Sequence, residues 1–263
     1  MNILSKIVSK RKEETNLQKK IRGLDEIKSS ESFHRQTYSL SKKIKESEIS
    51  IIAEHKRKSP SKKEINFQTP SHKIIKGYEK NGASGISVLT EKNFFSGSEN
   101  DLILARKLTD LPILRKDFIV DEYQVFESKY LGADAILLIA TCLTDKEIIK
   151  LSELAKELDL DVMVEIHSKD ELKKVCIDSV DIIGVNNRNL KDFSVNVKNS
   201  IEIGKEIPES FVKISESGLY KFEELKRLID FGYDGFLIGE LFMREVDPGY
   251  KLGNLINQIK GES

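Results

Sequence analysis

Eight short apolar runs recur along the chain from residue 49 onward, and this recurrence restricts the fold more than any other feature. Each run has the length and the β-branched content of a buried strand. The runs occupy residues 49–53, 86–89, 112–114, 135–139, 162–166, 182–186, 211–214 and 235–239. Charged segments with helical periodicity lie between them, for example at residues 72–81, 121–131, 145–158, 168–175 and 221–231. The unit repeats at intervals of roughly 20 to 35 residues, the size of one strand–helix repeat.

Alternating short strands and amphipathic helices imply an α/β fold with a parallel sheet. Eight such repeats within roughly 215 residues predict closure into a (β/α)8 barrel of the TIM type. A doubly wound open sheet is the alternative, but it normally carries a glycine-rich turn after its first strand. No such turn follows the first run here, so we expect the barrel.

A charged extension precedes the first strand. Ile3, Leu4, Ile7 and Val8 follow the i, i+3, i+4 spacing of an amphipathic helix. Their apolar stripe has to cover something, either the body of the chain or a partner. We therefore expect an N-terminal helical extension, residues 1–45, that packs on a barrel of residues 46–263 in a single domain and covers part of its mouth.

Serine, threonine and aspartate side chains stand where several helices should begin. Ser71, Asp121 and Thr144 (or Asp145) have the residue types of N-caps. Glycines at 82, 132 and 232 follow helical segments and precede strands, as helix-terminating glycines do. These signals support the boundaries of the repeat.

Charge and cysteine content exclude several classes of protein. The chain has 43 Lys and Arg against 43 Asp and Glu, whereas a nucleic-acid-binding protein usually shows a basic excess. Its two cysteines lack metal-site spacing and are too sparse for a disulfide scaffold. The longest apolar run, residues 135–140, is too short to span a bilayer, and the N-terminus lacks a signal-peptide core. We expect a cytoplasmic protein with no nucleic-acid or membrane partner.

Charged and amide side chains stand at or just after most of the predicted strands. Glu54 and Lys56 are two residues apart on an extended segment, so they should point to the same side. The later strands contribute Lys116, Glu165, Asn186, Arg188 and Glu216. Because the carboxyl ends of barrel strands converge on one mouth, these groups should meet over an apolar floor. A structural network of ion pairs is the competing interpretation.

Two glycine signals follow the last two strands. Ser217 and Gly218 come after the seventh strand, and Gly239 ends the eighth. Phosphate sites in this fold use these two loops and the start of a short extra helix. Residues 240–243 could form that helix, so the sequence predicts a phosphate site there.

These motifs together resemble the indole-3-glycerol phosphate synthase family, the decarboxylating ring-closure enzymes of tryptophan biosynthesis. The resemblance covers essentially the whole chain. Its matching stretches are residues 3–14, 51–62, 86–98, 112–124, 131–139, 184–190, 215–218 and 236–244. It implies a carboxy-lyase that converts 1-(2-carboxyphenylamino)-1-deoxyribulose 5-phosphate to indole-3-glycerol phosphate, carbon dioxide and water. No cofactor or metal is implied, and we expect a monomer or a weak homodimer.

The resemblance also implies roles for individual residues. Lys116 matches the general acid, and carboxylates such as Glu54 should keep its pKa high. Lys56 matches the lysine that pairs with the substrate carboxylate, and Glu165 matches the acid–base carboxylate on the anilino side. Which lysine acts as the acid in each step stays open.

The remaining matches concern orientation and binding. Residues that should orient the substrate and the catalytic groups are Glu54, Asn186, Arg188 and Glu216. Apolar walls for the aromatic ring are implied at Phe118, Leu137 and Leu190, for which ordinary core packing is the alternative. Phosphate contacts are implied at Ser59, Gly218 and Gly239, with Ser217 beside them.

Glu240 departs from the family pattern, in which many members have serine. A carboxylate cannot donate a hydrogen bond to a phosphate and would repel it. We therefore expect only the backbone N–H of Glu240 to contact the phosphate, with the side chain turned away. His55 and His167 flank catalytic positions, and strand alternation predicts that both point toward the helices.

Two other functions remain as alternatives. A sibling phosphate-binding barrel such as phosphoribosylanthranilate isomerase would have no use for the extension or for the paired lysines. A catalytically silent barrel that serves as a binding partner would not need every matched charged position. The lyase is the function that the sequence favours.

Overall fold

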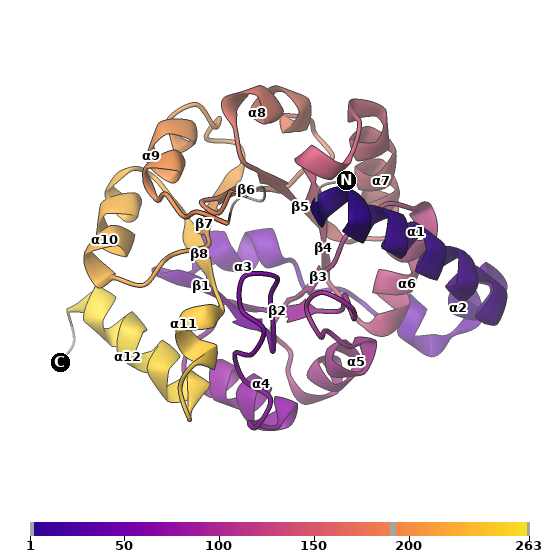
Figure 1. Ribbon diagram of the computed structural model, residues 1–263, viewed down its shortest axis with the longest axis horizontal. Helices are drawn as coiled ribbons and strands as arrows, with labels where there is room; N and C mark the ends of the chain where they lie inside the picture. The colour runs from indigo at the N-terminus through magenta and orange to yellow at the C-terminus, as the bar shows by residue number, and fades with distance from the viewer. Residues whose placement is uncertain (1–2, 190–192, 262–263) are drawn as a thin grey trace.

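Eight parallel strands close into a barrel in the computed structural model, which describes residues 3–189 and 193–261 (Figure 1). The strands are β1 Ser50–His55, β2 Gly85–Leu89, β3 Ile113–Lys116, β4 Ala135–Ile139, β5 Asp161–Ile166, β6 Ile182–Asn186, β7 Val212–Glu216 and β8 Gly235–Ile238. Each strand pairs with the next, and β1 also pairs with β8. The (β/α)8 TIM barrel is confirmed, and the open doubly wound sheet is excluded.

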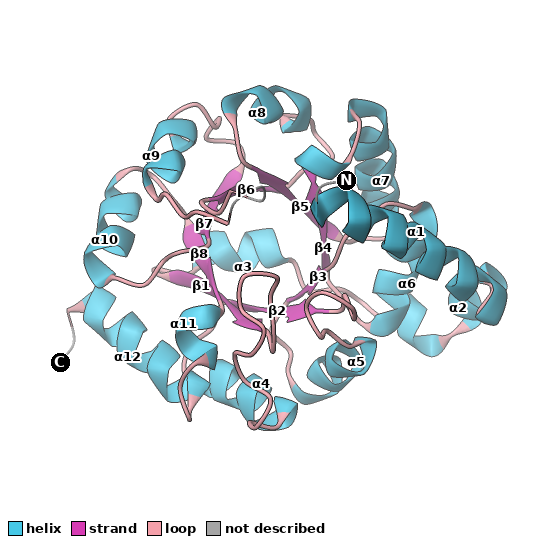
Figure 2. Ribbon diagram, viewed as in Figure 1, coloured by secondary structure: helices cyan, strands magenta, loops and turns pink. Residues whose placement is uncertain are grey.

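Helices form an outer ring around the strands (Figure 2). After the extension they are α4 Ser71–Lys80, α5 Glu99–Leu108, α6 Glu122–Leu131, η2 Ala140–Cys142, α7 Asp145–Glu157, α8 Lys169–Val175, α9 Lys198–Gly204, α10 Phe222–Asp230, α11 Glu240–Met243 and α12 Pro248–Lys260. The five helices used as examples of the repeat are confirmed, and so is the short helix after β8. The observed strands differ from the predicted ones by at most two residues at either end.

Two of the three predicted N-caps are confirmed. The Asp121 side chain accepts a hydrogen bond from the backbone of α6, and Thr144 forms a capping box with Glu147. The prediction for Ser71 is wrong, because Ser71 is the first residue of α4 and does not cap it. Its hydroxyl instead donates to Asp101, 2.8 Å away on α5, where it joins a tertiary ion-pair cluster.

The N-terminal extension reaches both ends of the barrel. Helix α1, Ile3–Ile21, lies over the mouth, and α2, Leu24–Ser29, and η1, Glu31–His34, pack against α6. Helix α3, Leu40–Glu46, contacts β1, β2 and β7 and is visible behind the barrel centre (Figure 1). The extension therefore covers part of the mouth, as expected, and its stripe packs on the body of the chain. Helix α3 lies at the opposite end of the barrel.

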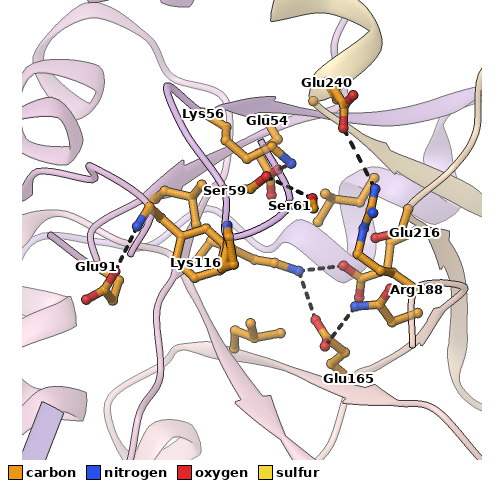
Figure 3. Close-up of a pocket in the computed structure, with 18 of the residues that line it drawn as sticks. Glu54, Lys56, Ser59, Ser61, Glu91, Lys116, Glu165, Arg188, Glu216 and Glu240 are labelled. Atoms are coloured by element: carbon orange, nitrogen blue, oxygen red, sulfur yellow. Dashed lines mark hydrogen bonds and ion pairs between the residues drawn. The ribbon is translucent and has the colours of Figure 1, made fainter. Parts of the chain in front are cut away.

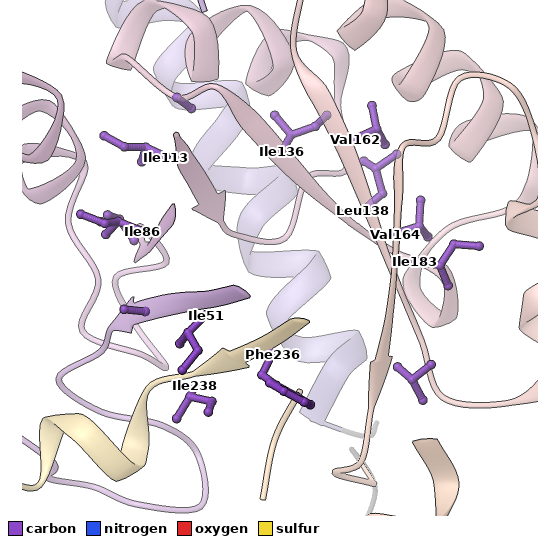
Figure 4. Packing of buried hydrophobic residues seen from close by; sticks show 14 of the residues in the cluster. Ile51, Ile86, Ile113, Ile136, Leu138, Val162, Val164, Ile183, Phe236 and Ile238 are labelled. Atoms are coloured by element: carbon purple, nitrogen blue, oxygen red, sulfur yellow. The ribbon is translucent and has the colours of Figure 1, made fainter. Parts of the chain in front are cut away.

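Strand alternation separates two apolar layers. On β1, Ile51 and Ala53 point outward to the helices, whereas Ile52 belongs to the cluster inside the barrel. Figure 4 shows the outer layer, to which every labelled side chain belongs. Because side chains alternate along a strand, Glu54 shares the inward face of Ile52 at the mouth. The same rule makes Lys116 an inward residue.

A buried ion pair fastens α1 to the end of β3. One guanidinium nitrogen of Arg11, Nη2, donates to Oδ2 of Asp117 at 2.9 Å, and both side chains are nearly inaccessible to solvent. Asp117 also accepts from Thr90 and Arg115. Since Asp117 directly follows Lys116, this pair links the position of the extension to the candidate site.

Replacing Arg11 with methionine should lower the free energy of unfolding by about 2 kcal/mol, because Asp117 then loses a buried charged partner. The Asp117 contacts with Thr90 and Arg115 should keep the loss from being larger. Urea denaturation followed by circular dichroism measures the change.

The matched control is Lys10→Met, which removes a neighbouring cation whose pair with Glu13 is exposed. Its effect should stay within about 0.5 kcal/mol, as for surface ion pairs in general. Equal effects of the two substitutions would show that the buried pair does not hold the extension.

Candidate active site

One cavity lies at the carboxyl ends of the strands, and nearly every predicted site residue lines it (Figure 3). The predicted residues among its lining are Glu54, Lys56, Ser59, Lys116, Phe118, Leu137, Glu165, Asn186, Arg188, Glu216, Ser217, Gly218, Gly239 and Glu240. The remaining predicted residue, Leu190, lies outside the described residues. The barrel thus brings together groups that are up to 186 positions apart in the sequence, from Glu54 to Glu240.

Lys116 is the centre of the charged network. Its Nζ lies 2.5 Å from Oε2 of Glu216 and 3.2 Å from Oε2 of Glu165. Burial alone would lower the pKa of Lys116, but the charges of Glu216, Glu165 and Glu54 raise it well above its ordinary value. The expectation that carboxylates keep this ammonium charged is confirmed, although Glu54 is not one of its direct partners.

Glu54 and Lys56 form a second ion pair, with 2.6 Å between Oε1 and Nζ, as their spacing predicted. Burial favours the neutral carboxyl, but Lys56 and Lys116 hold the pKa of Glu54 below its ordinary value. Gly239 makes room for this carboxylate, because a Cβ at that position would lie 2.8 Å from Oε1. Gly239, directly after β8, therefore makes room for Glu54 and also forms the start of the following loop.

The two carboxylates beside Lys116 differ in their environments. Glu165 accepts a hydrogen bond from Nδ2 of Asn186 at 3.0 Å, whereas Oε1 of Glu216 is buried and has no hydrogen-bond partner among residues 3–189 and 193–261. Burial and the charge of Glu165 raise the pKa of Glu216, and Lys116 opposes this rise. For Glu165 burial also favours the neutral form, but Lys116, His167 and the hydrogen bond from Asn186 together lower the pKa below its ordinary value. The pair is thus arranged to hold its protons unequally.

The prediction for His167 holds only in part, because its ring lies between helix α8 and the site. Its Nδ1 is 3.8 Å from Oε2 of Glu171 on α8, its Nε2 is 3.5 Å from Oε1 of Glu165, and it is not among the described residues that line the cavity. His167 follows the last residue of β5, and the alternation of the strand no longer fixes its direction. His55 does follow the prediction, since it is buried but is not among the described residues that line the cavity.

Apolar side chains close the other side of the cavity. Leu137 rises from β4, and the ring of Phe118 lies 6.1 Å from that of Phe95, centroid to centroid. Helix α1 contributes Ile3, Leu4 and Ile7 to the same lining. An aromatic ring could therefore lie between the charged centre and the extension.

The loops after β7 and β8 border the end where the sequence predicts a phosphate. Ser217 and Gly218 both have positive φ angles, 69° and 72°. At Gly218 an added Cβ would lie 2.0 Å from Val195, so only glycine fits. Ser59 faces this cavity from the loop after β1, with its Oγ 3.1 Å from Oγ of Ser61.

The side chain of Glu240 does not turn away as expected. Its Oε1 lies 3.0 Å from Nζ of Lys62 and contacts Arg244, and its Oε2 lies 3.8 Å from Nη2 of Arg188. Three cations surround the carboxylate, and their attraction keeps it at the edge of the cavity. The prediction considered only the repulsion between Glu240 and a phosphate and left out the attraction of the neighbouring cations.

Several residues of the site have no role in the sequence-based prediction. Lys62 lies within residues 51–62, one of the stretches that match the family. Its contact with Glu240 depends on how the loop after β1 folds. Glu91 is fully buried and accepts backbone hydrogen bonds from Asn93, Phe94 and Phe95, which shapes the loop after β2. A charged residue two positions after a predicted strand was the available signal for Glu91.

Comparison with known proteins decides the family. The family model for indole-3-glycerol phosphate synthase matches residues 4–255. The chain belongs to the indole-3-glycerol phosphate synthase family. The indole-3-glycerol phosphate synthase of Bacteroides thetaiotaomicron is 42% identical over 259 residues, covering 98% of this chain and 99% of the relative. That of Campylobacter jejuni is 45% identical over 258 residues, covering 97% and 100%.

Solved structures of other barrels share the architecture. The 3-hexulose-6-phosphate synthase of Salmonella typhimurium aligns with a TM-score of 0.64 and 13% identity, covering 80% of this chain and all of that one. At this identity the likeness concerns the fold alone. None of the helices within residues 3–189 and 193–261 has the length and apolarity to cross a membrane.

His55 should make this synthase-family barrel less stable as the pH falls. Burial lowers the pKa of His55 to about 4, against about 6.5 in an unfolded chain. The unfolded chain therefore binds the proton first, and the stabilisation that is complete above pH 6.5 is lost as the pH falls toward 4. Between pH 7 and pH 5 this group should remove about 2 kcal/mol of unfolding free energy.

Urea denaturation of the His55→Leu variant at both pH values tests this expectation. The variant should show a difference between the two pH values that is smaller by about that amount. His72→Leu, on the exposed surface of α4, is the control and should keep the parent's pH dependence. A His55→Leu variant with an unchanged dependence would contradict the assignment.

Proposed function

We propose that this chain catalyses the decarboxylating and dehydrating ring closure of 1-(2-carboxyphenylamino)-1-deoxyribulose 5-phosphate to indole-3-glycerol phosphate. One observation carries the proposal: a buried ammonium, Lys116, held between two carboxylates next to an apolar wall. The membership of the chain in the indole-3-glycerol phosphate synthase family supports it. This reaction belongs to the biosynthesis of tryptophan.

Ring closure requires protonation of a carbonyl. The ring carbon that bears the carboxylate attacks the substrate carbonyl carbon, and Lys116 donates a proton to the carbonyl oxygen as a general acid. Because its carboxylate neighbours keep it charged, Lys116 enters the step in its acidic form. Lys56 pairs with the substrate carboxylate, which then leaves as carbon dioxide, and the electron pair of the broken bond restores the aromatic ring.

Dehydration follows on the same intermediate. Glu165 removes a proton from the ring CH2 group beside the anilino nitrogen, and the electron pair of that C–H bond forms the C=C bond of the indole. One of the two lysines, Lys56 or Lys116, protonates the new hydroxyl, which leaves as water. Asn186 orients Glu165 through its hydrogen bond, and Glu216 holds Lys116 from the other side. Glu54 keeps Lys56 in place. Each step is a proton transfer or a bond change within the substrate, so the sequence of steps needs no redox cofactor.

The binding residues complete the proposal. Phe118 and Leu137 enclose the aromatic ring, and Arg188 and Ser217 contact the ribulose portion. Phosphate contacts are assigned to Ser59, Gly218, Gly239 and the backbone of Glu240. Leu190, outside the described residues, is proposed as a further apolar wall.

The wider organisation follows the same reasoning. We propose that residues 1–45 and 46–263 act as one domain, because α1 lines the cavity that the barrel forms. We also propose a cytoplasmic enzyme that works as a monomer or a weak homodimer on a phosphorylated small molecule.

Replacing Lys116 with alanine should abolish turnover and leave the fold intact. The rate should fall by at least about 1000-fold, since general acid catalysis contributes roughly 100- to 10000-fold and a stabilising charge is lost as well. The chain has no Trp, so the fluorescence of indole-3-glycerol phosphate can be followed against a low background.

Lys150→Ala is the control, because it removes the same charge from an exposed position on α7. It should keep the parent's rate, and circular dichroism should show the same fold for both variants. Substantial product formation by the folded Lys116→Ala variant would exclude the proposed acid.

A further inference from the structure

Glu240 stands within a group of three cations at one end of the cavity. Lys62 approaches from the loop after β1, Arg188 from the loop after β6, and Arg244 from one turn further along, beyond α11. Figure 3 shows the side chains of Arg188 and Glu240 directed toward each other. The carboxylate therefore connects two loops that border the candidate site.

The carboxylate of Glu240 is a resident anion. Burial disfavours its charged form, but the hydrogen bond from Lys62 and the charges of Arg244, Lys62 and Lys56 lower its pKa below the ordinary value. Its side chain is only 10% exposed, whereas those of Lys62 and Arg244 are 39% and 46% exposed. The cations are thus open to solvent on one side and neutralised by Glu240 on the other.

Glu240 and Arg188 line the same cavity as the glycines at 218 and 239 and as Ser59. An anion that binds at this end meets cations whose charge is already compensated, and it also meets the negative charge of Glu240. Like charges placed together at a binding site oppose binding. The neutral donors of the loops have to act against this repulsion.

We propose that Glu240 is an internal competitor of the substrate phosphate and sets the affinity of this site for phosphorylated ligands. The proposal rests on the proposed function, which assigns the phosphate to this end of the cavity. When phosphate binds, the carboxylate gives up Lys62 and Arg188 and keeps Arg244, its i+4 partner on the exposed side of α11. The two released cations then face the phosphate.

Direct binding of inorganic phosphate tests this competition without any need for turnover. The Glu240→Gln variant keeps the size of the side chain and removes its charge. Its dissociation constant for inorganic phosphate, measured by calorimetry, should fall by about tenfold, because the repelling charge is gone and the cations are uncompensated. An unchanged or weaker affinity would overturn the proposal and would show that Glu240 only braces the loops.

Glu245→Gln is the matched control. It removes one negative charge five positions further along the chain, at an exposed residue whose ion pair is with Lys251. Its phosphate affinity should equal that of the parent. If Glu245→Gln gained as much phosphate affinity as Glu240→Gln, the effect would come from the net charge of the protein. That result would contradict competition at the site.

The KM for the substrate gives a second readout. Since the same carboxylate has to be displaced by either ligand, KM and the phosphate dissociation constant should fall by a common factor in Glu240→Gln. If phosphate binds more tightly but no product forms in any variant, the proposed function fails and the competition stands. If product forms with an unchanged KM and phosphate affinity, the function stands and the competition fails.

Discussion

The ion pairs of Lys116 with Glu165 and Glu216 are the interactions on which the rest of the site depends. Together with Glu54, these three residues point inward from β1, β3, β5 and β7, the alternate strands of the barrel. In barrels of this type, four side chains from alternate strands form one layer of the interior. Two positions before each of these four residues, the same strand places an apolar side chain inside the barrel. These side chains are Ile52, Leu114, Met163 and Ile214. The site is therefore the uppermost layer of the core, built from charges in place of aliphatic groups.

A charged layer constrains its neighbours. When all four groups are ionised, three carboxylates and one ammonium carry two net negative charges in a confined space, and Lys56 compensates one of them from the loop after β1. The layer also needs room, and small residues on the even strands provide it: a Cβ at Gly184 would lie 2.9 Å from Oε1 of Glu216. A charged layer in the barrel core therefore restricts the size of neighbouring uncharged residues such as Gly184.

The sequence predicted the directions of those side chains that lie on regular strands. Inward positions such as Glu54, Lys116 and Glu165 follow from alternation alone, because each one lies on a strand whose register the barrel fixes. His167 and Lys62 lie just beyond strands or in loops, where no periodicity fixes a direction. The pair of Arg11 with Asp117 joins residues 106 positions apart and depends on how α1 crosses the mouth. No local pattern encodes such a contact, so it emerges only from the assembled structure.

The charged layer and the loops around Glu240 therefore tolerate amino-acid substitutions to different degrees. At the charged layer each residue is fixed by a strand and packed against others, and a substitution leaves a buried charge without a partner. At the other end Glu240, Lys62 and Arg188 lie on loops, and the two cations remain partly exposed. Water can compensate for a changed partner there, so the cost of an exchange is smaller. An acidic residue can stand beside the proposed phosphate site for this reason, and affinity for the ligand can be adjusted at the loops without disturbing the proposed proton-transfer groups below.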